Sequence, residues 1–175
     1  MQHNIINLPP KRKYLRHEYP NNIAREITYD EAVSTCYKLS QQLTDVDQII
    51  GIARSGMPFA TWISQMLNID LGYYNPVGNV FALVNNPKKI AFIDETSEWG
   101  HTQNKIRVLM QQYSNIEYVI CSVWIDCFHP QFNGYAADDI IYGEVLDQWI
   151  TKFAGVEKNF DEQRIKFREK KHDIK

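Results

Sequence analysis

The sequence predicts an α/β fold in which a parallel sheet is covered by helices on both faces. Two observations lead to this prediction. First, short apolar segments without helical periodicity alternate with segments whose apolar residues recur every three or four positions. Second, two of the apolar segments each run directly into a polar loop and a helix start, as in a crossover between parallel strands. A chain of 175 residues is long enough to bury such a core in one domain.

Composition and charge narrow the class of protein. The 44% hydrophobic and 23% charged residues are ordinary globular values, and a net charge of -2 gives no electrostatic attraction to nucleic acid. Cys36, Cys121 and Cys127 are odd in number and lie in apolar segments, which favours free thiols in a reducing compartment. The polar start and the lack of a long apolar run predict a cytoplasmic protein without a signal peptide or membrane span.

The first helix is predicted from its start signal. Thr28-Tyr29-Asp30-Glu31 reads as a capping box, in which the Thr28 hydroxyl and the Glu31 carboxylate bind backbone N–H groups at the helix start. The apolar face that follows consists of Ala32, Cys36, Leu39 and Leu43. Residues 48–53 then read as a short buried strand.

Helices and strands continue in alternation. Pro58 suits the first turn of a second helix, whose apolar face consists of Phe59, Ile63, Met66 and Leu67. Residues 69–74 and 80–84 are expected to be extended, and residues 90–93 to form the central strand. Thr102 is expected to cap a third helix, whose apolar positions are Ile106, Leu109, Met110 and Tyr113. Segments 118–125 and 139–145 complete the predicted sheet.

The chain divides into an arm, a domain and a tail. Residues 1–25 are polar and basic and predict a solvated arm, with phosphate binding as the alternative. Residues 26–155 form the predicted domain. Residues 156–175 mix both signs of charge and predict a solvated helix or tail, with partner binding as the alternative.

Two acids and a glycine-containing loop follow the central strand. Asp94 and Glu95 end the strand, and Gly100 precedes Thr102 at the predicted helix start. A strand–loop–helix segment directs free N–H groups and the positive end of a helix at one point, which suits a phosphate. The acids are placed to meet sugar hydroxyls or a magnesium-bound substrate. The alternative is an ordinary crossover whose strand ends in polar residues.

A second loop has the same form. Residues 49–53 predict a strand that ends in Arg54, Ser55 and Gly56 before the helix containing Pro58. The small residues let the backbone approach a ligand, and arginine supplies a permanent charge with a fork that fits phosphate. Each of the two loops therefore predicts a phosphate-binding site.

The two loop segments, taken in their order along the chain, resemble the signature of the type I phosphoribosyltransferases. Asp94, Glu95, Gly100 and Thr102 fall on its characteristic positions. The likeness covers residues 28–150 and implies a single-domain phosphoribosyltransferase-like fold with a small base-binding hood. It implies a magnesium-dependent glycosyltransferase, commonly a homodimer, that moves ribose 5-phosphate from 5-phosphoribosyl 1-pyrophosphate (PRPP) to a nucleobase and releases pyrophosphate.

The resemblance also implies roles for individual residues. Asp94 and Glu95 would serve the ribose hydroxyls and Mg²⁺, and Glu98 would be the general base for the proton of the incoming nucleobase. An exposed loop acid is the alternative for Glu98. The implied substrate-binding residues of the two loops are Arg54, Ser55, Gly56, Thr96, Ser97, Trp99, Gly100, His101 and Thr102.

At the base site the resemblance is greatest to the purine-salvage (hypoxanthine/xanthine-guanine) members. His129 takes the place of a lysine that meets the purine, Ile140 the place of a stacking aromatic, and Ile141 the place of a residue at the base edge. Asp147 falls near a further acidic position. An isoleucine recovers only part of the stacking energy of an aromatic ring, so the nucleobase stays open; Trp149 would be a substitute ring or a core residue.

The region between residues 75 and 89 is shorter than the mobile flap that the family carries there. Closure over the substrates is therefore reduced or comes from elsewhere. These departures leave a second function open, namely a regulator on the same fold that binds PRPP or a nucleotide with little or no transferase activity. A hydrolase or phosphorylase acting on a nucleotide is a further alternative.

Overall fold

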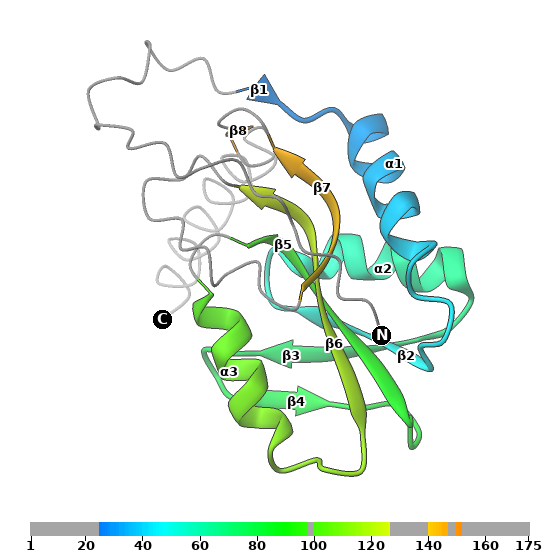
Figure 1. The fold of residues 1–175 in the computed structure, drawn as a ribbon, viewed down its shortest axis with the longest axis vertical. Coiled ribbons are helices and arrows are strands. Elements are labelled where there is room, and N and C mark those ends of the chain that lie inside the picture. The colour runs from blue at the N-terminus through cyan, green and yellow to red at the C-terminus, as the bar shows by residue number, and fades with distance from the viewer. Residues whose placement is uncertain (1–24, 98–99, 127–139, 147–149, 152–175) are drawn as a thin grey trace, which may run out of the picture.

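The computed structural model describes residues 25–97, 100–126, 140–146 and 150–151. Their main feature is a six-stranded sheet in the order β4-β3-β2-β5-β6-β7, parallel except for the antiparallel pair of β3 and β4 (Figure 1). The strands are β2 (Gln48–Ile52), β3 (Asp70–Asn75), β4 (Val80–Ala82), β5 (Lys89–Ser97), β6 (Glu117–Asp126) and β7 (Ile140–Leu146). Two short strands, β1 (Arg25–Glu26) and β8 (Ile150–Thr151), pair separately.

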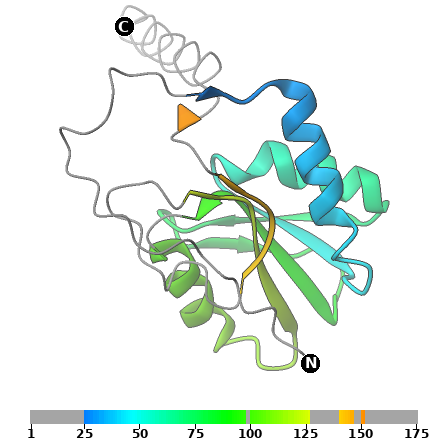
Figure 2. The ribbon, with the colours of Figure 1, turned by 45° about the horizontal axis from the view of Figure 1, so that its top comes forward.

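Helices cover both faces of the sheet, as the sequence predicts (Figure 2). Helices α1 (Tyr29–Ser40) and α2 (Gly56–Leu67) pack on one face against a cluster that includes Ala91 and Ile93 of β5. Helix α3 (His101–Met110) packs on the other face against Ile90 and Phe92 of the same strand. Alternate residues of β5 therefore serve opposite cores, which buries this central strand on both sides.

The capping box of α1 is confirmed. The Glu31 N–H donates to Thr28 Oγ1 over 3.3 Å, and the Thr28 N–H donates to Glu31 Oε2 over 2.9 Å. The predicted apolar face is buried at all four positions, which are Ala32, Cys36, Leu39 and Leu43. Helix α1 is thereby fixed against α2 and the sheet.

Helix α2 differs from the prediction at one position. Phe59 and Ile63 are buried, but Met66 is 39% exposed. Leu67, four residues after Ile63, takes the inward position in the last turn and packs against the core. Met66 is consequently turned outward.

Helix α3 begins differently from the prediction. Thr102 does not cap it: the N-cap residue is Gly100, with φ of 76°, and Thr102 lies within the first turn. The tight turn from β5 into the helix needs a left-handed residue, which glycine adopts without strain. Ile106, Leu109 and Met110 are buried as predicted, whereas Tyr113 follows the helix and packs against the same cluster.

The β3–β4 hairpin is held to the core by aromatic rings. Phe81 of β4 stacks on Phe92 with centroids 5.8 Å apart and meets Tyr113 edge-on at 5.1 Å. The predicted strand over 80–84 ends at Ala82.

The predicted arm of residues 1–25 apart from Arg25, the tail over 156–175 and most of the predicted base-binding hood lie outside the described residues. Among the described helices, none is both long and apolar enough to cross a membrane.

Candidate functional site

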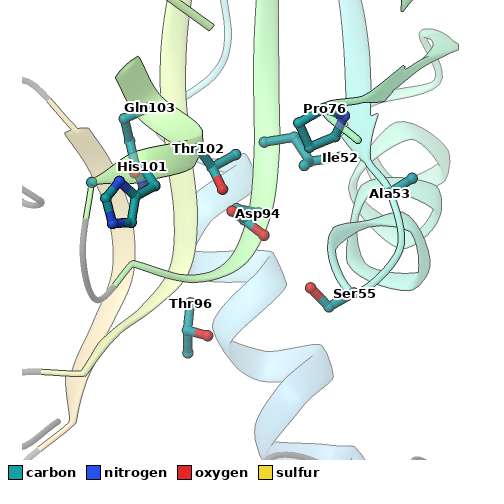
Figure 3. A pocket seen from close by; sticks show the side chains of 10 residues that line it. Ile52, Ala53, Ser55, Pro76, Asp94, Thr96, His101, Thr102 and Gln103 are labelled. Atoms are coloured by element: carbon teal, nitrogen blue, oxygen red, sulfur yellow. The ribbon is translucent and has the colours of Figure 1, made fainter. Parts of the chain in front are cut away.

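A cavity of about 280 Å³ lies at the carboxyl ends of β2 and β5. The end of β5 and the start of α3 form one wall, and the loop after β2 and the β3–β4 turn form the other (Figure 3). The lining residues are Asp94, Thr96, Gly100, His101, Thr102 and Gln103 on the first side, and Ile52, Ala53, Ser55 and Pro76 on the second. The two predicted phosphate loops thus meet at one pocket, as expected for the strand ends of a parallel sheet.

Asp94 is the acid that faces this pocket. Its side chain is 8% exposed, and its Oδ1 accepts a hydrogen bond from the Glu95 N–H over 2.9 Å. Figure 3 shows the Asp94 carboxylate beside Thr102, with the Ser55 hydroxyl across the pocket from them. A buried carboxylate in a pocket favours a ligand that donates hydrogen bonds.

Glu95 is not among the lining residues of this pocket. Successive side chains of a strand point to opposite faces, so Asp94 lies on the α3 side and Glu95 on the α1–α2 side. Glu95 is 4% exposed, and its role toward sugar or metal stays a prediction.

The start of two helices at the pocket makes it suitable for anions. Neither the N-cap of α2, Ser55, nor that of α3, Gly100, uses a side chain to bind the first-turn N–H groups. Each helix start carries partial positive charge from its aligned peptide dipoles. A pocket between two such ends, with one carboxylate inside it, matches a ligand that has anionic groups at both ends and hydroxyl groups between them.

Arg54 lies beside the pocket, and its side chain is exposed. The Ala53–Arg54 peptide bond is cis, and the backbone around it forms the turn from β2 into α2. Ser55 lines the pocket directly, whereas Arg54 and Gly56 are not among the lining residues. The predicted contact of Arg54 with pyrophosphate would be made from the rim.

Four of the lining residues were not predicted, and Gln103 is the one among them with a signal in the sequence. Gln103 is 3% exposed and lines the cavity, and its Nε2 donates to Ser97 Oγ over 2.8 Å. Its signal in the sequence is a polar residue on the apolar face of α3, three positions before Ile106 and seven before Met110. Ile52, Ala53 and Pro76, which also line the pocket, carry no comparable signal.

Of the predicted base-binding residues, Ile140 and Ile141 are described, and neither is among the lining residues of this pocket. Ile140 and Ile141 begin β7, two strands from β5, and their side chains pack in or against the apolar clusters. Glu98, Trp99, His129 and Asp147 lie outside the described residues. Their roles stay predictions.

The described residues hold no cluster of three or more His, Cys, Asp or Glu side chains suited to a metal ion. Mg²⁺ needs no such cluster, because it keeps several waters and is often held by one or two carboxylates and substrate phosphates. Asp94 in the pocket fits that type of site.

No protein-family model matches the sequence, and no curated protein matches it. Solved structures do match. A purine phosphoribosyltransferase from Pyrococcus horikoshii is 20% identical with a TM-score of 0.55, over 72% of this chain and 89% of that one. The xanthine-guanine-hypoxanthine phosphoribosyltransferase of Helicobacter pylori is 17% identical with a TM-score of 0.62, over 79% of this chain and 97% of that one.

A third match is a structure with a bound ligand. A hypothetical protein from Neisseria gonorrhoeae with bound ppGpp is 12% identical with a TM-score of 0.51, over 72% of this chain and 85% of that one. At such identities, the likeness shows that the chain has the phosphoribosyltransferase fold.

Proposed function

We propose that this chain, which has the phosphoribosyltransferase fold, is a magnesium-dependent phosphoribosyltransferase that transfers ribose 5-phosphate from PRPP to a nucleobase and releases pyrophosphate. The observation that supports this most is the buried Asp94 carboxylate in a pocket between the starts of α2 and α3. PRPP has the matching chemistry, because it is a pentose with ring hydroxyls between a phosphate and a pyrophosphate.

Each end of PRPP has a partner in the pocket. The 5-phosphate would lie at the start of α3, on the N–H groups of residues 100–102 and the Thr102 hydroxyl. The pyrophosphate would lie at the loop between β2 and α2, on the backbone near Ser55, with Arg54 approaching from the rim. The ribose hydroxyls between them would donate to Asp94.

Asp94 also suits the transition state. As the bond between ribose C1 and the pyrophosphate oxygen lengthens, its electrons leave with pyrophosphate and the sugar gains positive charge. A carboxylate fixed in a site with little water stabilises that charge more in the transition state than in the ground state. Mg²⁺ would neutralise charge on the pyrophosphate.

The incoming base completes the reaction. Its nitrogen forms the new bond to C1 and gives its proton to Glu98, the proposed general base. A purine is the proposed substrate, with His129 and Asp147 at the base. The side chains of Ile140 and Ile141 pack in or against the apolar clusters, so these two residues would meet the base through their backbone.

The second candidate function is a regulator that binds PRPP or a nucleotide on the same fold. Two observations favour it. The ppGpp-bound Neisseria protein shares the fold, and the Ile140 and Ile141 side chains pack into the sheet core. The two functions share the phosphate sites and differ in the chemical step.

A two-stage experiment tests the proposal. Isothermal titration with PRPP and Mg²⁺ establishes binding, and pyrophosphate release is then measured with a panel of purine and pyrimidine bases. The transferase proposal expects release that depends on one base and on Mg²⁺. Binding of PRPP without release for any base would favour the regulator. The absence of PRPP binding would reject the transferase and leave only a regulator that binds a nucleotide.

A further inference from the structure

We infer that the hydrogen bond between Gln103 and Ser97 is a clamp that positions the start of α3 for the phosphate end of the ligand. This inference rests on the proposed function. Gln103 is a positioning residue in this role, because it acts through the N–H groups of the neighbouring residues.

The clamp joins the two sides of the phosphate loop. Ser97 is the last residue of β5, and Gln103 is the third residue of α3. Gly100, His101 and Thr102 lie between them and line the pocket. A side-chain bond between positions 97 and 103 therefore fixes the helix start relative to the strand that carries Asp94.

Burial makes this contact consequential. Ser97 is 0% exposed and Gln103 is 3% exposed, and Gln103 Nε2 donates to Ser97 Oγ over 2.8 Å. Ser97 is fully buried and Gln103 nearly so, and removing either side chain breaks the hydrogen bond that links β5 to α3. The strand and the helix start then lose the link that sets their spacing.

The position of Gly100 explains why such a link is needed. Gly100 adopts φ of 76° at the N-cap, and glycine is the residue with the fewest backbone restrictions. The N–H groups of the first turn bind a phosphate only when they point at the same spot. A clamp across the turn reduces the number of arrangements that the free protein samples, and preorganisation of this kind increases affinity.

The clamp acts on one end of the ligand. The loop around Ser55, which is proposed to hold pyrophosphate, belongs to β2 and α2 and not to β5 and α3. Loss of the clamp is therefore expected to weaken binding of ribose 5-phosphate and to leave binding of pyrophosphate with Mg²⁺ unchanged. A general loss of structure would weaken both.

The test uses Gln103→Met, which keeps the length of the side chain, Ser97→Ala, and the two combined. We expect each single variant to bind ribose 5-phosphate about tenfold more weakly, and the losses in the double variant to be less than additive, because both substitutions break the Gln103–Ser97 bond. Pyrophosphate affinity is expected to change by less than about twofold.

Ser64→Ala is the matched control. Ser64 is also a buried serine, and its Oγ donates to Ile69 O over 2.6 Å at the far end of α2. It is expected to lose stability in urea unfolding like Ser97→Ala but to keep wild-type affinity for ribose 5-phosphate. If one of the two single variants, Gln103→Met or Ser97→Ala, no longer unfolds cooperatively in urea, the affinity measurements are made on the other.

The possible outcomes distinguish failure of the clamp from failure of the proposed function. Unchanged ribose 5-phosphate affinity in the variants, equal losses for both ligands, or additive losses in the double variant would overturn the clamp alone. A wild-type protein that binds neither PRPP nor ribose 5-phosphate would overturn the proposed function and the clamp with it.

Discussion

Gly56, the first residue of α2, lies directly against the backbone of Asp94. A Cβ atom at Gly56 would stand 3.0 Å from Asp94 Cα and 2.3 Å from Ile93 O. Both neighbours are backbone atoms of the central strand, so neither can rotate away. The absence of a side chain at Gly56 therefore sets the spacing between the start of α2 and the acid in the pocket.

Gly56→Ala is expected to push α2 away from β5. The added methyl group meets backbone, and overpacking of this kind costs about 1–3 kcal/mol of stability. PRPP affinity should fall more than stability explains, because the loop at Ser55 moves with the helix. Titration calorimetry and urea unfolding measure the two effects. Gly78→Ala is the control, since a Cβ there has no neighbour closer than 3.4 Å.

Asp94→Asn tests the carboxylate in the pocket. The amide keeps the size of the side chain but removes the charge that is proposed to face the ribose hydroxyls and Mg²⁺. We expect PRPP affinity in Mg²⁺ to fall about 10- to 100-fold, consistent with the loss of charged hydrogen bonds of about 1.5–3 kcal/mol. Asp45→Asn removes an exposed acid near the other end of β5 and should leave affinity unchanged. Equal affinities of the two variants would contradict the role of Asp94.

Glu98→Gln tests the proposed general base. The variant should lower kcat about 10²–10⁴-fold, the usual contribution of a positioned acid or base, while PRPP affinity stays near wild type. Steady-state kinetics and calorimetry on the same preparation measure both quantities. Parallel losses in turnover and binding, or no loss, would remove Glu98 from this role.

The burial of two thiols predicts how their reactivity and the stability of the protein depend on pH. Burial raises the pKa of Cys36 to about 12 and raises that of Cys121 as well. In a Cys127→Ser background, neither thiol should react with a disulfide reagent at pH 9 until urea unfolds the chain. Because the unfolded thiols titrate near 8.5, stability should fall as pH rises above that value. Rapid labelling of the folded protein would contradict the packing of α1 and β6.

Thr28→Ala removes one half of the capping box of α1. The loss of the Oγ1 acceptor for the Glu31 N–H should cost about 1 kcal/mol of unfolding free energy, measured in urea. Thr28→Ser keeps the hydroxyl and should cost much less. The same loss in both variants would show that the methyl group, and not the cap, stabilises the helix.

The sequence was sufficient for the sheet, its helices and the meeting of the two loops, because these follow from apolar periodicity and from the rule that parallel strands end at one edge. It was not sufficient for details set by tertiary packing. Met66 is exposed because Leu67 occupies the inward position, and the helix begins at His101 because Gly100 makes the turn. Those outcomes depend on neighbours in space.

The candidate site also combines features that the sequence predicts with features that depend on tertiary packing. The placement of Asp94 and Thr102 at one pocket follows from the motif, and strand alternation also explains why Glu95 lies on the other face. The Ser97–Gln103 bond does not follow from the motif, because it depends on how closely α3 approaches β5.

The anchoring of the β3–β4 hairpin has a consequence for how ligands exchange. Pro76 stands in the pocket wall, and the hairpin that carries it is fastened to the interior through Phe81 and Phe92. We therefore expect this wall of the pocket to stay in place while ligands bind and leave. Ligand binding and release past this wall then require no slow rearrangement of the hairpin. We therefore expect the association rate to be governed by diffusion and by the charge of the ligand.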